Sequence, residues 1–188
     1  MKKLLIAVLA PALLATPATL AQAQKEKAPA AEKSTQTDSK AAEFIKKAAM
    51  GDMFEIQSGQ LALQKSTDAK VKGFAEGLVN DHKASSDKLK STVQAAQLPP
   101  PPTELDDKHK KMLDKLQSAS GREFDRAFLD MQVKAHKEAV ELFWTYAREG
   151  DNPELKTFAQ RTLPTLEDHF KHAQSLEGSS PASTGSSK

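Results

Sequence analysis

Apolar residues recur at helical spacing through most of the chain between residues 39 and 176. At about 100° per residue they form one stripe along each of four segments, a pattern that predicts four long amphipathic helices. The predicted helices cover residues 39–65, 66–97, 120–150 and 153–176. A short amphipathic helix is predicted at 103–117, after the prolines at 99–102, which interrupt any helix because proline lacks a backbone N–H.

Residues that favour helix ends mark the boundaries of these segments. Asp68 is a good N-cap for the second long helix, and Asn152 with Pro153 supplies a cap and a first-turn proline for the fourth. Ser120 and Glu123 have the spacing of a capping box. Because short connections join antiparallel neighbours, the pattern predicts an all-α fold. We expect an up-down four-helix bundle with one extra short helix after the proline-rich linker.

Each long helix carries one ionisable residue at or near the centre of its apolar stripe. These residues are Glu55, His82, His136 and His169. Each lies near the middle of its helix, roughly 20–25 Å along the axis at a rise of 1.5 Å per residue. Antiparallel packing would therefore bring them to one level of the bundle. An isolated carboxylate in an apolar interior costs several kcal/mol, so Glu55 must meet a cation, a hydrogen-bond donor or a metal.

These residue types suggest a metal site. Imidazole nitrogen and carboxylate oxygen together suit Zn, Fe, Mn, Cu or Ni. We therefore predict that Glu55 and the three histidines bind one divalent transition-metal ion. Hydrogen-bond acceptors behind the ligands would fix the imidazole tautomers, and the candidates are Asp52, Asp125 and Gln132. The alternative is a metal-free network in which Glu55 pairs with His82 or His136, and the sequence leaves both open.

A second apolar stripe follows another side of the first helix. Its members are Met50, Met53, Phe54 and Leu61. One interpretation is packing against the short helix at 103–117. The other is a contact with a second copy of the chain or with a protein partner of the cell envelope. We favour the packing interpretation.

Composition narrows the classes of function. The chain has no cysteine, which excludes disulfides, thiolate metal sites and a cysteine nucleophile. The first 23 residues hold two lysines and no acid, so the remaining chain balances 25 basic against 25 acidic side chains. Nucleic-acid binding needs a basic excess, so we expect no nucleic-acid partner.

The two ends differ in composition from the predicted bundle. Residues 1–23 resemble a secretory signal peptide, with Lys2 and Lys3 before an apolar run and a cleavage site after Ala23. The run is too short to span a bilayer comfortably, although an uncleaved anchor is the alternative. Residues 24–40 and 177–188 hold almost no large apolar side chain, so we expect both to be disordered. These assignments leave 41–176 as the bundle domain, in a periplasmic or secreted protein whose mature chain is expected to have no transmembrane segment.

Four stretches of the chain carry a family resemblance. They read FIKKAAMGDMFEIQSGQLAL, FAEGLVNDHKASSDKL, FDRAFLDMQVKAHKEAVELF and LKTFAQRTLPTLEDHFKHAQ. The Asn80-Asp81-His82 step, the Gln132–His136 spacing and the Leu163-Pro164…His169 step are the specific parts. Over about residues 40–176 the chain resembles a secreted bacterial family numbered 4142 among the domains of unknown function. The resemblance implies an exported, ferritin-like four-helix bundle with no established activity.

The sequence departs from a ferritin-type di-iron site. Such a site needs Glu-x-x-His on two helices, but Val79, Val133 and Leu166 stand three residues before the inward histidines. Two bridging carboxylates are therefore missing, which leaves a mononuclear, histidine-rich site as the hypothesis.

Two functional hypotheses follow. The preferred one is a non-enzymatic or weakly active domain that holds one metal ion in its interior. The alternative is a structural or interaction protein of the cell envelope, linked to stress, whose interior polar residues form a metal-free network. We do not predict an enzyme, because no set of acid, base and nucleophile can be assigned.

Overall fold

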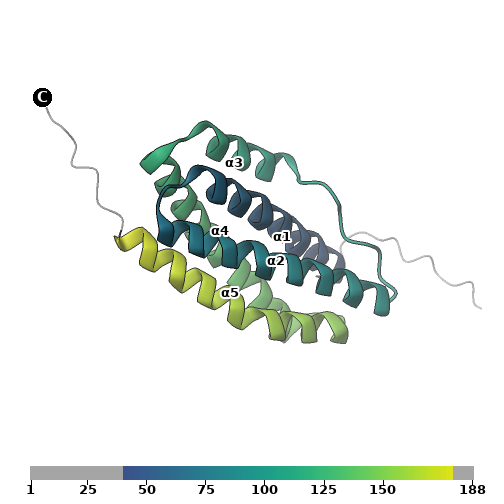
Figure 1. The fold of residues 1–188 in the computed structure, drawn as a ribbon. Coiled ribbons are helices and arrows are strands. Elements are labelled where there is room, and N and C mark those ends of the chain that lie inside the picture. The colour runs from purple at the N-terminus through teal and green to yellow at the C-terminus, as the bar shows by residue number, and fades with distance from the viewer. Residues whose placement is uncertain (1–39, 180–188) are drawn as a thin grey trace, which may run out of the picture. The chain divides into compact units, whose positions relative to one another are not determined.

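A computed structural model describes residues 40–179, and every regular element among them is an α-helix. The elements are α1 (Lys40–Lys65), α2 (Ala69–Ala95), α3 (Asp107–Ser118), α4 (Gly121–Glu149) and α5 (Pro153–Ser179). The four long helices form a bundle, and α3 lies outside it against α1 and α4 (Figure 1). The all-α prediction is confirmed. The predicted signal peptide, its cleavage site and most of both predicted disordered segments lie outside the described residues.

The helix ends follow local capping chemistry at two of the three predicted positions. Asp68 accepts hydrogen bonds from the backbone N–H groups of Lys70 at 2.7 Å and Val71 at 3.3 Å. Asn152 Oδ1 accepts one from the N–H of Leu155 at 3.0 Å. These three bonds satisfy N–H groups that have no partner within their own helix. Helix α5 continues past the predicted end at residue 176 to Ser179.

The predicted capping box at the start of α4 is wrong. Ser120 is the N-cap, but its side chain makes no capping hydrogen bond. The next residue, Gly121, has φ of 54°, in the left-handed region that favours glycine. A regular capping box needs right-handed helical geometry in the first turn, so the altered backbone direction here explains why the box does not form.

The direction of the helices follows from the long connection that carries α3. Neighbours in the bundle are α1 with α2, α2 with α5, α5 with α4, and α4 with α1. Residues from the start of α1 and the end of α2 meet at one end, together with the end of α4 and the start of α5. Each neighbouring pair is therefore antiparallel. The segment from 96 to 120 returns the chain to the end where α2 began, so α2 and α4 run parallel, as in ferritin-like bundles with one long crossover.

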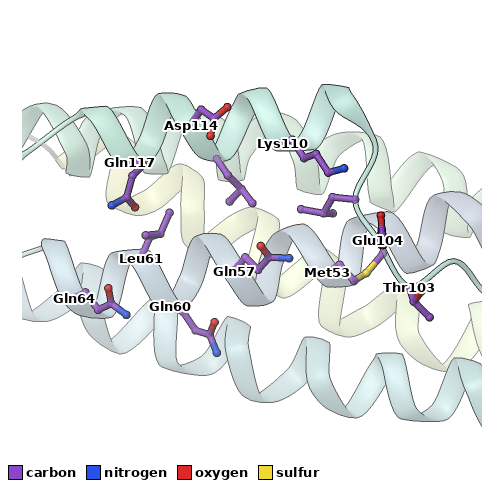
Figure 2. Close-up of a pocket in the computed structure, with 12 residues that line it drawn as sticks. Met53, Gln57, Gln60, Leu61, Gln64, Thr103, Glu104, Lys110, Asp114 and Gln117 are labelled. Carbon is purple, nitrogen blue, oxygen red and sulfur yellow. The ribbon is translucent and has the colours of Figure 1, made fainter.

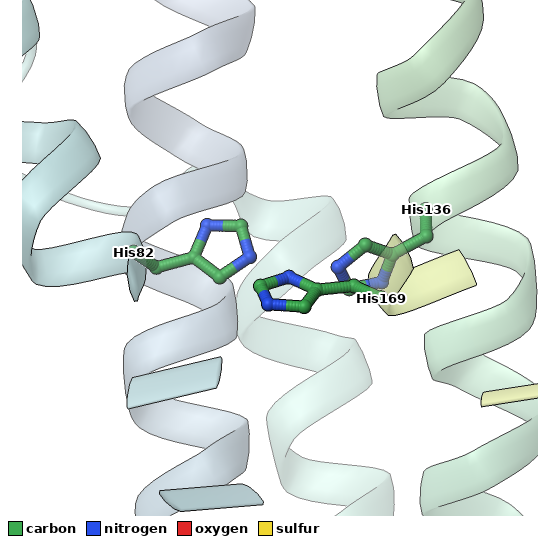
Figure 3. A group of neighbouring side chains, drawn as sticks. All are labelled: His82, His136 and His169. Atoms are coloured by element: carbon green, nitrogen blue, oxygen red, sulfur yellow. The ribbon is translucent and has the colours of Figure 1, made fainter. Parts of the chain in front are cut away.

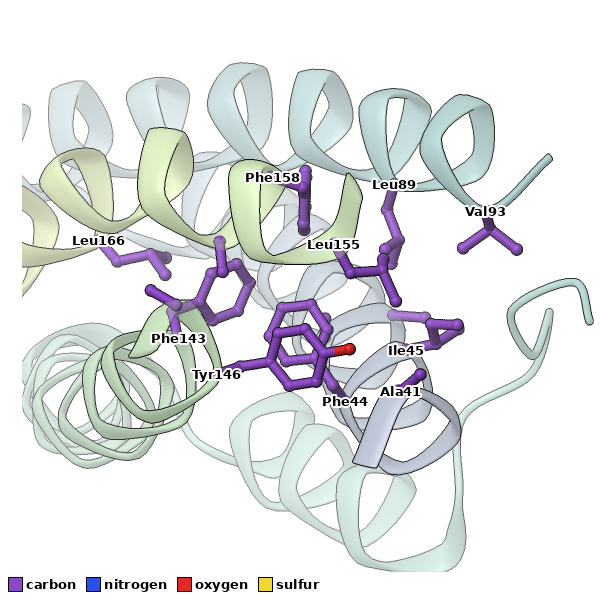
Figure 4. Close-up of a cluster of buried hydrophobic side chains, with 14 residues drawn as sticks. Ala41, Phe44, Ile45, Leu89, Val93, Phe143, Tyr146, Leu155, Phe158 and Leu166 are labelled. Atoms are coloured by element: carbon purple, nitrogen blue, oxygen red, sulfur yellow. The ribbon is translucent and has the colours of Figure 1, made fainter. Parts of the chain in front are cut away.

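Two apolar clusters fill the two ends of the bundle. One contains Phe44, Phe143 and Tyr146 among its buried members (Figure 4), and we call it the aromatic cluster. Phe44 stacks on Tyr146 with ring centroids 4.1 Å apart and meets Phe143 edge-on at 5.0 Å. The second cluster, at the opposite end, is built around Phe74 and Phe128. The ionisable residues predicted to face inward come from the helix segments between these clusters.

One glycine brings α1 and α2 close together beside this middle region. A Cβ at Gly59 would stand 2.7 Å from Cγ2 of Val79 and 3.2 Å from the carbonyl oxygen of Ala75. Only a residue without a side chain fits such an approach. Gly59 thus sets the spacing of the two helices that carry Asp52, Glu55 and His82.

The second apolar stripe of α1 is covered within the chain. Met50 and Phe54 are 6% and 1% exposed and form a buried cluster with Leu105, against which Met112 of α3 packs. The packing interpretation therefore holds. The predicted partner contact through Met50, Met53, Phe54 and Leu61 is wrong for the two buried members, because α3 and the segment before it stand over them. No helix within residues 40–179 has both the length and the apolar character needed to cross a membrane.

Candidate metal centre

Three of the four residues predicted as ligands come together in the middle of the bundle. His82 lies on α2, His136 on α4 and His169 on α5, and their rings turn toward one another (Figure 3). One ligand nitrogen from each ring lies within 4.8 Å of one from each of the others. The residues are 4%, 1% and 9% exposed. We call these three residues the histidine triad.

Each ring of the triad is held by a hydrogen bond through one of its nitrogens. The bonds join His82 Nδ1 to Asp52 Oδ1 at 2.8 Å, His136 Nδ1 to the Gln132 carbonyl oxygen at 3.0 Å, and His169 Nε2 to Asp81 Oδ2 at 2.9 Å. The carbonyl oxygen can only accept, so Nδ1 of His136 carries the proton. A carboxylate behind an imidazole selects the tautomer in the same way and makes the opposite nitrogen more basic.

The opposite nitrogens are buried and have no partner. His82 Nε2, His136 Nε2 and His169 Nδ1 make no hydrogen bond to any described residue. Buried polar atoms in proteins are usually paired, so three unpaired ring nitrogens on three neighbouring histidines need an explanation. A shared electron-pair acceptor, such as a metal ion, satisfies all three at once.

Burial keeps two of these imidazoles neutral. It lowers the pKa of His82 to about 3, and the neighbouring His169 adds to the effect. It also lowers the pKa of His136 to about 3, reinforced by His82 and His169. At neutral pH these rings therefore keep the lone pair that a metal requires.

Glu55, the fourth predicted ligand, is buried nearby but does not join the triad's group of ligand atoms. Burial raises the pKa of Glu55 to about 8 against the opposing effect of hydrogen bonding from Gln132, and it raises the pKa of Asp52 to about 7. Oε2 of Glu55 and Oδ2 of Asp52 have no hydrogen-bond partner within residues 40–179. The assignment of Glu55 as a ligand stays a prediction.

The residues predicted to stand behind the ligands have different roles. Asp52 contacts Nδ1 of His82 through Oδ1. Gln132 contacts His136 through its backbone carbonyl, and its side-chain amide donates to Ser58 Oγ at 3.1 Å. Asp125 is buried but lies about 16 Å along α4 from His136 at 1.5 Å per residue, so the structure does not bring it to the imidazoles.

Sequence reasoning missed Asp81. Its carboxylate holds His169 although its side chain is 52% exposed. Candidate residues in the sequence came only from the apolar face of each predicted helix, and half-exposed Asp81 does not lie on that face. The signal that could have found it is its position directly before His82, which turns Asp81 about 100° around α2 toward a neighbouring helix.

Comparison with known proteins identifies the family. The model of the family called domain of unknown function (DUF4142) matches residues 20–176. The chain belongs to the DUF4142 family. The resemblance noted in the sequence is thereby confirmed. No curated protein matches this DUF4142 chain.

Solved structures share the fold of the DUF4142 chain. CopM in its Cu(II)-bound form has a TM-score of 0.62 and 21% identity, over 73% of this chain and 95% of that chain. A DUF305 fragment from Deinococcus radiodurans has a TM-score of 0.63 and 15% identity, over 74% and 95%. A DUF305 protein from Streptomyces coelicolor, described as secreted, has a TM-score of 0.62 and 12% identity, over 73% of this chain and 91% of that chain. At these identities the likeness shows the helical bundle alone.

A cavity connects the candidate centre to the surface. It has a volume of about 870 Å³, and its lining includes Asp52, Glu55, His82 and His136. Charged side chains of both signs, among them Lys108 of α3, also line it. A small ion could therefore reach the triad without separation of the long helices.

A second hollow, between α1 and α3, contains none of the candidate ligands (Figure 2). It has a volume of about 590 Å³ and is lined by a row of amide side chains, Gln57, Gln60 and Gln64, with Gln117 opposite.

Proposed function

We propose that this DUF4142 chain is an exported metal-binding protein that holds one transition-metal ion on His82, His136 and His169. The proposal is carried by three buried histidines that each offer one ligand nitrogen within 4.8 Å of the others. Each ring also has one buried nitrogen without a partner among the described residues and is anchored through its other nitrogen. Two nitrogens on one ion lie at most about 4.2 Å apart, twice a usual metal–nitrogen distance. Small ring rotations from a spacing within 4.8 Å would complete the site.

The surroundings of the triad suit a cation. Asp52 and Asp81 place carboxylates directly behind two of the three rings. A bound cation would favour the ionised form of Asp52, which burial otherwise makes harder to reach. Bound metal would link α2, α4 and α5 through one histidine of each helix.

Glu55 is our proposed fourth ligand. Its support is its burial, its unpaired Oε2 and its place in the lining of the same cavity as His82 and His136. Glu55→Gln keeps the size of the side chain and removes the charge. If Glu55 is a ligand, this variant keeps the triad but binds metal more weakly than wild type.

The proposal includes copper as the first metal to test. Imidazole suits Zn, Fe, Ni and Cu, so the ligand set alone does not select among them. CopM, which shares the fold, has been solved in Cu(II)-bound, Cu(I)-bound and Ag-bound forms. Export is also part of the proposal, and its support is the predicted signal peptide together with the fold neighbour described as secreted.

The decisive experiment measures metal in protein purified without chelators and loaded with Cu(II) or Zn(II). We expect about one equivalent per chain after dialysis, and a large loss in His136→Ala. His172→Ala is the matched control, because His172 lies one turn from His169 but is exposed on the surface of α5. Sub-stoichiometric metal in the wild type, or full loading of His136→Ala, would overturn the proposal in favour of a metal-free structural network.

A further inference from the structure

The methionines of the described chain gather in one place. The sequence has five methionines, and all except Met1 lie in or against the cluster built on Met50, Phe54 and Leu105. The others are Met53 of α1, Met112 of α3 and Met131 of α4. The buried members of the aromatic cluster and of the cluster at the opposite end include no methionine.

Two of these methionines border the path to the histidine triad. Met50 and Met112 line the same cavity as His82 and His136. Met50 also lies two residues before Asp52, whose carboxylate holds His82. An ion that passes through this cavity therefore meets thioether sulfur as well as imidazole.

A fourth histidine lines the same cavity as Met50 and Met112. His109 lines the cavity, and its ring lies 5.6 Å from that of Phe54, a member of the methionine cluster. Nδ1 of His109 is 2.6 Å from Oδ1 of Asp106. That contact leaves Nε2 as the nitrogen for a ligand, on a ring oriented by a carboxylate as the rings of His82 and His169 are.

Thioether sulfur distinguishes between kinds of metal ion. It is a soft, neutral ligand that binds Cu(I) and similar monovalent ions, whereas hard divalent ions prefer oxygen. We propose that Met50, Met112 and His109 form a second metal site, for a soft monovalent ion such as Ag(I) or Cu(I), in the cavity that leads to the triad. The site itself does not depend on the triad. Its role in delivering an ion to the triad rests on the proposed function.

The first test follows the methionine methyl groups directly. The full chain is labelled with ¹³C at the methionine methyls and titrated with Ag(I), a redox-inert probe. We expect the Met50 and Met112 signals to shift in step with one equivalent, whereas Met53, which lines the separate amide-lined hollow, keeps its position. Unchanged signals, or equal shifts of all the methionines, would show that the sulfurs serve only as pliable packing.

The second test counts ions in variants. Met50→Leu/Met112→Leu keeps side-chain volume, so the fold should persist, and Met53→Leu is the matched control. We expect about two equivalents of Ag(I) in wild type and in the control, and about one in the double variant. An unchanged Ag(I) count in the double variant would overturn the second site.

The same variants separate this proposal from the proposed function. Zn(II) loading of the triad should be equal in wild type and in the double variant, because neither Met50 nor Met112 belongs to the group of triad ligand atoms. His136→Ala should lose Zn(II) but keep one Ag(I). If the wild type takes up no Zn(II) while Met50 and Met112 still respond to Ag(I), the triad proposal fails and the second site stands.

Discussion

The aromatic cluster and the histidine triad occupy the same bundle and are about equally buried, yet they are built in opposite ways. Around Phe44, rings stack and meet edge-on at 4.1 and 5.0 Å. Around His136, three imidazoles stand with centroids 5.3–5.6 Å apart, and each keeps one unpaired nitrogen. The first region stabilises the fold by apolar burial, whereas the second costs free energy unless something binds its polar atoms. One layer of the interior therefore stabilises the fold without any ligand, and the other holds buried polar atoms that lack partners among the described residues.

The largest expected effect tests the aromatic side of this comparison. Phe44→Ala should lower the free energy of unfolding by about 3–5 kcal/mol, because it removes a buried ring and leaves a cavity. Urea denaturation measures the loss, and the metal bound per folded chain should not change. Trp144→Ala is the control, since Trp144 is 48% exposed and its loss should cost much less. Loss of metal from folded Phe44→Ala would mean that the two layers are not independent.

The next effect tests whether the triad gains stability from a ligand. Metal at 100–1,000 times its Kd should add about 3–4 kcal/mol of stability and raise Tm by roughly 10 °C. EDTA should reverse the rise, which differential scanning calorimetry can follow. His136→Ala should melt at the same temperature with and without metal. A wild-type Tm that ignores both metal and EDTA would make the triad a structural network.

The helices and their convergence could be predicted because both follow from local periodicity. A stripe at helical spacing fixes which residues face inward, and mid-helix positions fix their height, so His82, His136 and His169 could be brought to one level. The caps at Asp68 and Asn152 are equally local. The capping box predicted at Ser120 does not form because Gly121 has a positive φ. The spacing of residues in the sequence does not reveal such a backbone conformation.

The lateral geometry of the site could not be predicted. Which of the four predicted ligands come close to one another depends on how each helix is rotated about its own axis. Hydrophobic periodicity in the sequence defines that rotation only approximately. The same uncertainty hid Asp81, which reaches His169 from the edge of α2. These details follow from packing between helices, to which close approaches such as that at Gly59 contribute.

A smaller effect should come from the carboxylates behind the rings. Asp52→Asn removes the charge that orients His82 and should weaken metal binding by about 10–100-fold, the usual cost of such a change. Asp81→Asn should cost less, since water at this half-exposed position can replace part of the interaction. Asp87→Asn, on the exposed face of α2, is the control. Competition with a chelator of known affinity gives the three Kd values, and equal values in all three variants would contradict the role of Asp52.

The smallest expected effect is a change of stability with pH. It should come from the layer that contains the histidine triad, Asp52 and Glu55, because these two acids titrate near neutrality. Burial raises the pKa of Asp52 to about 7 and of Glu55 to about 8, so the folded state binds protons that the unfolded state has released. The stability that these acids contribute at low pH is lost as the pH rises through those values. Burial lowers the pKa of His82 and of His136 to about 3. Below about pH 6.5 the unfolded state binds protons that these folded imidazoles do not, so their contribution to stability rises with pH and offsets part of the loss from the acids.

The metal-free protein should therefore lose about 1–2 kcal/mol of stability between pH 6 and pH 8. Urea denaturation at each pH, in the presence of EDTA, measures this. Glu55→Gln removes the group with the higher pKa and should flatten the profile. Bound metal should also flatten it, because a cation favours the ionised carboxylates. A flat metal-free profile over this range would mean that water or rearranged hydrogen bonds already stabilise the ionised acids, and the polar layer would then resemble the aromatic cluster in needing no ligand.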